Sequence, residues 1–317
     1  MAVNYDAEPI LTVDGLKQYF KVSSSFTVHA VEDVSFKIYP GETYGLVGES
    51  GSGKSTIGRS VIRLYDPTAG TIRFNGMDIS GKMSKETNKA LRTQMQMIFQ
   101  DPMASLNPRK KVRDILGEGL DIHHMYKNKE EREEKIKAIL AKVGLAPEHA
   151  ARYPHQFSGG QRQRVGIARA LIMNPKLIIA DECISALDVS IQAQVVNLMK
   201  DIQQETGTAY LFIAHDLSMV KYISDRIGVL HLGHLLETGT TEEIFENPMH
   251  PYTRSLLSAI PSPNPAVEKN RVAETYDYKT SGIDYKAGTY QHISGTHYVK
   301  CTDGEFEKFK SMPRLEY

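Results

Sequence analysis

A stretch near residue 50 combines residue types that bind phosphate with the spacing that such binding needs. Residues 48–56 match the pattern G-x-x-x-x-G-K-S/T in full, and they are Gly48, Glu49, Ser50, Gly51, Ser52, Gly53, Lys54, Ser55 and Thr56. The glycines let the backbone curl around a polyphosphate so that its N–H groups face the negative charge. Lys54 can then reach the β- and γ-phosphates, and the Ser55 hydroxyl can ligate Mg²⁺. The alternative is a glycine-rich turn that binds nothing, and the lysine and hydroxyl argue against it.

The acidic pair Asp181-Glu182 is the second set of residues suited to this chemistry. It follows the apolar run Leu177–Ala180, which is typical of a central parallel strand. Ligands of open α/β sheets lie outside the carboxyl ends of the strands, so we expect both carboxylates in a nucleotide crevice. Asp181 then suits Mg²⁺, and Glu182 suits a general base for the attacking water. The preceding buried run argues against a merely solvated surface pair.

Two further polar side chains follow predicted strands. Gln100 comes after Met95–Phe99, and His215 comes after Ala209–Ala214. Gln100 becomes a candidate site residue when a Mg²⁺ site lies nearby, and otherwise it is an ordinary loop residue. A histidine at a strand end of the same sheet can reach a γ-phosphate, although a lone histidine is more often structural.

The segment Ser158-Gly159-Gly160-Gln161 predicts a second anion site at the start of a helix. The serine caps the helix, and several backbone N–H groups there have no partner within the helix. One nucleotide needs one cradle, so we predict that this second cradle serves the nucleotide of another subunit in a head-to-tail pair. The alternative is a well-capped structural helix.

The elements around these residues predict an α/β core with additions. An apolar strand, Tyr44–Val47, precedes the phosphate loop, and a helix-compatible segment, Thr56–Leu64, follows it. Residues from Asp101 to about Phe157 are predicted to form a helical insertion, with opposite charges at i,i+4 spacing on a solvated face. The proline-rich run Pro261–Pro265 is the best linker candidate.

Strand patterns at Ile10–Phe20 and Val28–Tyr39 predict an antiparallel sheet beside the loop. Within it, Tyr19 or Phe20 can stack on a purine ring, since a flat aromatic face suits any base. Either residue can instead be a core aromatic.

The composition is that of an ordinary globular protein. The 317 residues suggest about two domains, and 38 basic against 38 acidic residues leave no global positive field for nucleic acid. Two cysteines, Cys183 and Cys301, are too few for a disulfide framework, which fits a reducing cytosol. The longest apolar runs are too short to span a bilayer, so we expect the chain not to enter a membrane unaided.

Taken in chain order, these segments together with Asp188 resemble the nucleotide-binding domains of ABC transporters over about residues 8 to 260. The resemblance implies a P-loop NTPase ABC-type core, a mostly parallel sheet flanked by helices, with an N-terminal antiparallel β subdomain and a helical subdomain. It implies that Tyr19 stacks on adenine, that Gln100 senses Mg²⁺ and the water, and that Asp181 is the Walker B aspartate.

The same resemblance makes Glu182 the catalytic base and His215 the switch histidine. It makes Ser158–Gln161 the signature that closes over a partner's ATP, and Asp188 a D-loop residue beside it. Phe157 and Cys183 depart from the commonest pattern, in which leucine precedes the signature and proline follows the glutamate. Neither change removes a functional group, so we expect an active ATPase site.

Two segments, Gln100–Arg109 and His250–Leu257, look like the oligopeptide and dipeptide permease branch, and most like its F-type ATPase subunit. This implies a nucleotide-binding domain at 1–260 and a C-terminal extension at 261–317. It also implies ATP and Mg²⁺ as ligands, a D-type ATPase partner, two transmembrane permease subunits and an extracellular peptide-binding protein, with no nucleic acid. The chain would lie peripherally at the cytoplasmic face of the membrane. Only Cys301 stands where the branch often carries a cysteine cluster, so no iron–sulfur cluster is predicted.

Two other functions stay open at this point. An ABC ATPase acting on DNA or the ribosome would share the motifs, although such relatives tend to carry a long coiled-coil insertion or tandem cassettes. An adaptor that binds ATP without hydrolysing it would share them as well. Within the transporter interpretation, the segment Met103–Leu106 is predicted to receive the permease's coupling helices.

Overall fold

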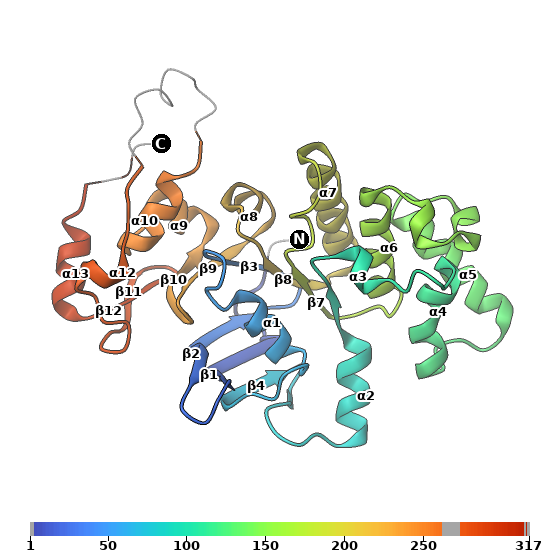
Figure 1. The fold of residues 1–317 in the computed structure, drawn as a ribbon, viewed down its shortest axis with the longest axis horizontal. Coiled ribbons are helices and arrows are strands. Elements are labelled where there is room, and N and C mark those ends of the chain that lie inside the picture. The colour runs from blue at the N-terminus through green and yellow to red at the C-terminus, as the bar shows by residue number, and fades with distance from the viewer. Residues whose placement is uncertain (1–2, 262–272, 314, 316–317) are drawn as a thin grey trace.

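Two β-sheets with helices around them organise the chain (Figure 1), and the computed structural model describes residues 3–261, 273–313 and 315. Apart from Pro261, the predicted linker Pro261–Pro265 lies outside the described residues. The first sheet has the strand order β2-β1-β4-β5 and is antiparallel throughout. Its strands are β1 (Leu11–Lys21), β2 (Thr27–Ile38), β4 (Ala69–Phe74) and β5 (Met77–Asp78). The predicted antiparallel sheet beside the loop is therefore confirmed.

The second sheet has the strand order β11-β12-β10-β9-β3-β8-β7-β6. The run from β9 to β6 is parallel, and β10, β12 and β11 continue the sheet in antiparallel fashion. Its strands are β3 (Thr43–Val47), β6 (Met95–Ile98), β7 (Leu177–Asp181), β8 (Ala209–Ile213), β9 (Arg226–His231), β10 (His234–Thr240), β11 (Thr289–Ser294) and β12 (His297–Cys301). The predicted α/β core is confirmed.

The helices connect and cover these strands. The helices are α1 (Lys54–Val61), α2 (Lys85–Gln94), α3 (Pro102–Ser105), α4 (Val112–His123), α5 (Lys129–Lys142), α6 (Gly159–Leu171), α7 (Val189–Thr206), α8 (Leu217–Ile223), α9 (Thr241–Glu246), α10 (Pro251–Ser258), α12 (Tyr278–Ser281) and α13 (Asp303–Lys310). Two short 3₁₀ helices, η1 (Pro147–Ala151) and η2 (Pro154–Gln156), lead into α6. The predicted helical insertion is therefore present as α3, α4, α5, η1 and η2.

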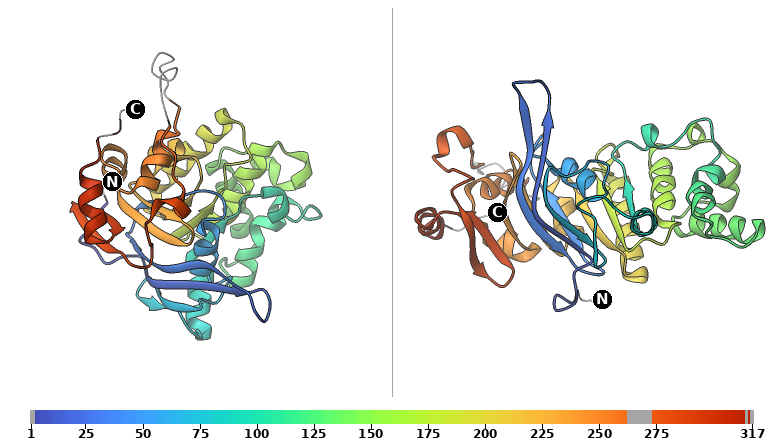
Figure 2. Two further views of the ribbon diagram at one scale, coloured as in Figure 1. Left: turned by 60° about the vertical axis from the view of Figure 1, so that its left-hand side comes forward. Right: turned by 90° about the horizontal axis from the view of Figure 1, so that it is seen from below.

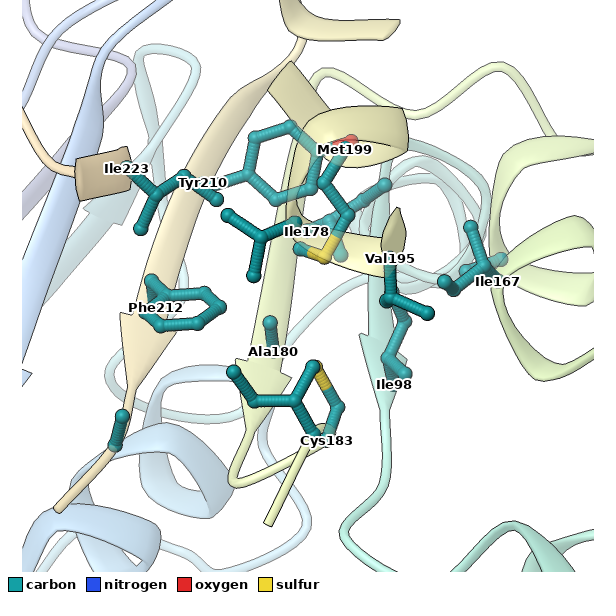
Figure 3. Packing of buried hydrophobic residues seen from close by; sticks show 14 of the residues in the cluster. Ile98, Ile167, Ile178, Ala180, Cys183, Val195, Met199, Tyr210, Phe212 and Ile223 are labelled. Atoms are coloured by element: carbon teal, nitrogen blue, oxygen red, sulfur yellow. The ribbon is translucent and has the colours of Figure 1, made fainter. Parts of the chain in front are cut away.

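The central strands are apolar because both faces of the sheet are covered. Every residue of β3, β7 and β8 is buried, as expected for parallel strands between layers of helices. On one face, Ile178 and Phe212 pack with Met199 of α7 in the larger core cluster, and Figure 3 shows these side chains converging. On the other face, Ile57 and Val61 of α1 belong to a second cluster that includes residues of both sheets. The helix after the phosphate loop is therefore fixed between the two sheets.

The strand register brings the ends of β3 and β7 to the same edge of the sheet. β8 lies between them, and its last residue, Ile213, pairs with Leu46 of β3 and with Asp181 of β7. Parallel strands end at a common edge, so the phosphate loop after β3 and the acidic pair at the end of β7 become spatial neighbours.

The C-terminal residues extend the second sheet. β12 pairs with β10 through Glu237 and Val299, and β11 pairs with β12. Figures 1 and 2 show these elements on the side of the molecule opposite to the helical insertion. The division of the chain at residue 260 stays a prediction, and residues beyond it share a sheet with the core.

The structure places Leu106 inside the protein. The side chain is 2% exposed and belongs to the larger core cluster, together with Val112 and Ile115 of α4. A buried side chain offers no docking surface, so the prediction that the segment Met103–Leu106 receives the permease's coupling helices is wrong for Leu106. The side chain of Met103 lies outside the described residues, and the rest of that prediction stays a prediction. Within the described ranges, no helix has the length and apolar character that crossing a membrane requires.

The buried residue His250 gives the fold a measurable pH dependence. It caps α10 by accepting the N–H of Tyr252 at 3.0 Å, and burial, followed by the influence of His231, lowers its pKa from 6.5 to about 3. The His250 imidazole takes up a proton more readily in the unfolded chain than in the folded one. The contribution of neutral His250 to the free energy of unfolding is therefore complete above pH 6.5 and declines as the pH falls toward 3.

We therefore expect His250→Asn, which keeps a capping acceptor, to reduce the loss of stability at low pH. Between pH 6.5 and pH 5 the free energy of unfolding should fall by about 2 kcal/mol less in the variant. Urea unfolding of both proteins at each pH measures this difference, and parallel pH profiles would contradict the assignment.

Candidate active site

The phosphate loop between β3 and α1 fits its surroundings only with glycine at two positions. Gly48 has a φ of 150°, and a Cβ there would lie 2.0 Å from the Leu230 carbonyl oxygen. Gly53 has a φ of 105°, and a Cβ there would lie 2.4 Å from the Ala30 carbonyl oxygen. The loop is thus held between the end of β9 and the strand β2, which fixes its curvature.

Lys54 crosses the inside of the loop. Its side chain is 3% exposed, and Nζ donates to the carbonyl oxygens of Gly48 at 2.7 Å and Glu49 at 2.8 Å. Burial lowers the pKa of Lys54, while the nearby carboxylates of Glu182 and Asp181 act in the opposite direction. A cation enclosed in this way is suited to an incoming phosphate group.

Ser55 and Asp181 meet at the start of α1. The Ser55 hydroxyl donates to Asp181 Oδ1 at 2.6 Å, and Asp181 is 1% exposed. Burial raises the pKa of Asp181, whereas the bond from Ser55 and the charge of Arg59 lower it. A hydroxyl and a carboxylate in contact are hard oxygen ligands of the kind that Mg²⁺ prefers, so these residues fit a magnesium ion.

Gln100 and Glu182 also meet, although 82 positions separate them in the sequence. Gln100 Nε2 donates to Glu182 Oε2 at 2.8 Å. Glu182 has a φ of 44°, a left-handed backbone conformation that is uncommon for glutamate, and its N–H donates to the Ile213 carbonyl at 2.9 Å. Such conformations cost free energy and concentrate at functional sites, where they direct a side chain.

These residues share one cavity of about 410 Å³. Its lining consists of Val28, His29, Ala30, Ser50, Gly51, Gly53, Lys54, Ser55, Thr56, Gln100, Glu182, Leu232 and Gly233. Phosphate-loop backbone, a buried cation and a carboxylate therefore face one space, with Asp181 directly behind Ser55. The arrangement can bind a polyphosphate and activate a water molecule beside it.

Tyr19 does not line this cavity itself but stacks on His29, which does. Its ring stacks on His29 with centroids 4.0 Å apart, and its hydroxyl donates to the Glu32 carboxylate at 2.7 Å. In the described part of the chain, the cavity lining includes His29 and not Tyr19. The sequence analysis did not single out His29, because the strand pattern does not fix the hairpin register that pairs His29 with Tyr19.

The signature segment caps α6 at the surface. Ser158 is exposed, its hydroxyl accepts the Gln161 N–H at 3.3 Å, and the Gln161 side chain accepts the Ser158 N–H at 3.1 Å. A Cβ on Gly160 would lie 2.6 Å from Ile191, so the segment packs against the first turn of α7. Asp188, also exposed, is the N-cap of that helix.

The cavity lining within one chain therefore has no member from Ser158 to Gln161, nor Asp188, as far as the structure describes it. His215 is exposed just after β8 and is likewise outside that lining. The roles of Ser158, Gly159, Gly160, Gln161 and Asp188 at a partner's nucleotide stay predictions.

Comparison with known families identifies two regions. The ABC transporter family matches residues 31–185, and the oligopeptide/dipeptide transporter C-terminal region matches residues 236–282. The chain is 58% identical to the oligopeptide transport ATP-binding protein OppF of Bacillus subtilis, over 95% of this chain and 99% of that protein. It is 52% identical to the dipeptide transport ATP-binding protein DppF of Lactococcus lactis, over 98% and 99% of the two chains.

Solved structures with a similar fold are ATP-binding cassettes. One is the dimeric post-hydrolysis state of the cassette MJ0796 bound to ADP and phosphate, with a TM-score of 0.67 and 28% identity. The match covers 73% of this chain and 98% of that one. Another is cbiO1 from Clostridium perfringens, with a TM-score of 0.66 and 27% identity over 75% and 91% of the chains.

The contact between Gly53 and β2 predicts a selective loss of nucleotide binding. In Gly53→Ala the new methyl group would overlap the Ala30 carbonyl, so we expect the Kd for ATP to rise at least about tenfold. Gly76→Ala is the matched control, because Gly76 also has a positive φ, of 76°, but a Cβ there meets no atom within 4 Å. Calorimetric titration should show unchanged affinity for the control, and equal affinities for both variants would refute the steric argument.

Proposed function

The chain belongs to the ATP-binding subunits of ABC transporters, in the oligopeptide/dipeptide transport branch, and on this premise we propose how its residues power peptide uptake. Hydrolysis of ATP takes place in the cavity between the phosphate loop and the ends of β6 and β7. The observation that carries the proposal is the convergence of Lys54, Ser55, Gln100 and Glu182 on this one space.

The phosphate loop binds the nucleotide in this proposal. Backbone N–H groups from Ser50 to Thr56 surround the β- and γ-phosphates, and Lys54 moves from its two loop carbonyls to the phosphate oxygens. Ser55 and Asp181, with Gln100 nearby, would hold Mg²⁺. When bound, Mg²⁺ neutralises charge that develops on the phosphate oxygens. His29, with Tyr19 stacked behind it, offers an aromatic face to adenine.

Glu182 activates the attacking water. The Gln100 amide donates to one carboxylate oxygen, Oε2, which would leave the other oxygen to accept the proton of the water. The left-handed backbone conformation of Glu182 also helps to orient its side chain. His215, which follows the neighbouring strand, would contact the γ-phosphate when the site closes.

A second ATPase subunit completes the site from outside. The N-terminus of α6, from Ser158 to Gln161, where Ser158 and Gly159 are exposed, and the adjacent Asp188 would close over the partner's nucleotide. Exposed Val189, at 75% of its maximum, is consistent with a contact surface at this point. We propose a related D-type subunit as the partner, since the signature segment of each chain would then close over the nucleotide bound by the other.

Peptide transport follows from coupling this closure to membrane subunits. We propose two transmembrane permease subunits, an extracellular peptide-binding protein, and a peripheral location at the cytoplasmic face of the membrane. The names of the OppF and DppF relatives support peptides as the transported substrates. The same relatives argue against the alternative ATPase acting on DNA or the ribosome.

Glu182→Gln tests the assignment of the base and separates an ATPase from an adaptor that only binds ATP. Hydrolysis should fall by about 10²- to 10⁴-fold, because the amide cannot accept the proton, while the Kd for ATP stays within about twofold. Phosphate release with the partner subunit present, and ATP titration, measure the two quantities.

Glu205→Gln is the control, since Glu205 is exposed on α7 and forms a surface ion pair with Lys142 at 3.0 Å. It should hydrolyse ATP at the native rate. A native rate in Glu182→Gln would place the base elsewhere, and no hydrolysis by the native complex would favour the adaptor.

A further inference from the structure

A side chain outside the cavity lining forms a hydrogen bond with the backbone of the phosphate loop. The Glu49 N–H donates to the Tyr252 hydroxyl at 3.0 Å, and Tyr252, on α10, is 1% exposed. In the described residues, neither Glu49 nor Tyr252 lines the cavity. We propose that Tyr252 positions the phosphate loop for ATP and that the C-terminal residues after 273 hold Tyr252 in place. This inference rests on the proposed nucleotide-binding role of the cavity.

The bond from Glu49 to Tyr252 is independent of the bonds that the nucleotide would disrupt. Lys54 Nζ holds the Gly48 and Glu49 carbonyls, and these bonds compete with phosphate for the same ammonium group. The Glu49 N–H, in contrast, already has a partner outside the cavity. When Lys54 turns to the phosphates, the Tyr252 hydroxyl still holds the first peptide after Gly48.

Tyr252 is also linked to the wall of the cavity through His231. Their rings stack with centroids 4.0 Å apart and an interplanar angle of 20°. His231 is the last residue of β9, and the next two residues, Leu232 and Gly233, line the cavity. A shift of the Tyr252 ring would therefore affect the cavity both through Glu49 of the phosphate loop and through His231.

Residues of the C-terminal extension fix both rings. Tyr285 contributes its hydroxyl to a bond with His231 Nδ1 at 2.6 Å, and the Tyr276 and Tyr285 hydroxyls are 2.9 Å apart. Tyr276 also packs edge-on against Tyr252, with centroids 5.7 Å apart. A chain of direct contacts thus runs from the extension to the phosphate loop.

The base of α10 is fastened to the extension as well. Glu237, which is fully buried, accepts the N–H groups of Met249 and His250 at 2.8 and 2.9 Å and contacts His297 Nε2 at 2.7 Å. On the next turn, Arg254 donates to both oxygens of Glu274 at 2.8 and 3.1 Å. The buried contact between Glu237 and His297 and the two-bond pair between Arg254 and Glu274 keep α10, and with it Tyr252, in one position relative to the extension.

Removing only the hydroxyl tests the positioning role. Tyr252→Phe keeps the ring and its stacking on His231 but leaves the Glu49 N–H without its acceptor. We expect the Kd for ATP, measured by calorimetry on the full chain, to rise about fivefold, as the loss of one hydrogen bond implies, with the binding stoichiometry unchanged. Tyr285→Phe should raise the Kd in the same direction and by less, since it acts through His231.

Tyr210→Phe is the matched control. Tyr210 is 1% exposed, and its hydroxyl is buried without a hydrogen-bond partner in the described ranges, so removing it should leave the Kd unchanged. An unaltered Kd in Tyr252→Phe would overturn the inference, as would a change confined to stoichiometry or melting temperature, which a merely structural role predicts. If Tyr252→Phe does not fold, an unaltered Kd in Tyr285→Phe would overturn the inference. Failure of the native chain to bind ATP would instead refute the proposed function.

Discussion

The strands β3, β7 and β6 end at one edge of the second sheet, and this shared edge determines which polar residues meet. Because β8 pairs with both β3 and β7, the residues that follow these strands are neighbours whatever their distance in sequence. Ser55 can then bond to Asp181, and Gln100 can bond to Glu182. No one of these polar groups could bind a triphosphate alone. The sheet register brings them together, and the buried apolar runs of the strands maintain that register.

The residues predicted from the sequence were those whose chemistry is tied to a fixed local spacing. In the structure, Ser55 of the phosphate loop bonds to Asp181, and Gln100 bonds to Glu182, whereas the roles predicted for these residues stay predictions. Their positions follow from local geometry and from one rule about parallel strands. Leu106 shows where such reasoning fails, since a short helix turns it into the core and no local pattern reveals that direction.

Contacts that depend on distant pairing could not be predicted in this way. His29 enters the cavity wall because of its register opposite Tyr19, which a strand prediction alone does not fix. Tyr252 reaches Glu49 across 203 positions, and Tyr285 reaches His231 across 54 positions. Tyr276 and Tyr285 of the C-terminal residues contact Tyr252 and His231, which adjoin the phosphate loop and the cavity wall.

In the proposed function the γ-phosphate of ATP lies between Lys54 and Glu182. A structure of the chain with Mg²⁺ and a slowly hydrolysed ATP analogue would locate this phosphate. We expect Lys54 Nζ to leave the Gly48 and Glu49 carbonyls and to lie within about 3 Å of a γ-phosphate oxygen. A nucleotide bound elsewhere, or one bound here with Lys54 still on both carbonyls, would contradict it.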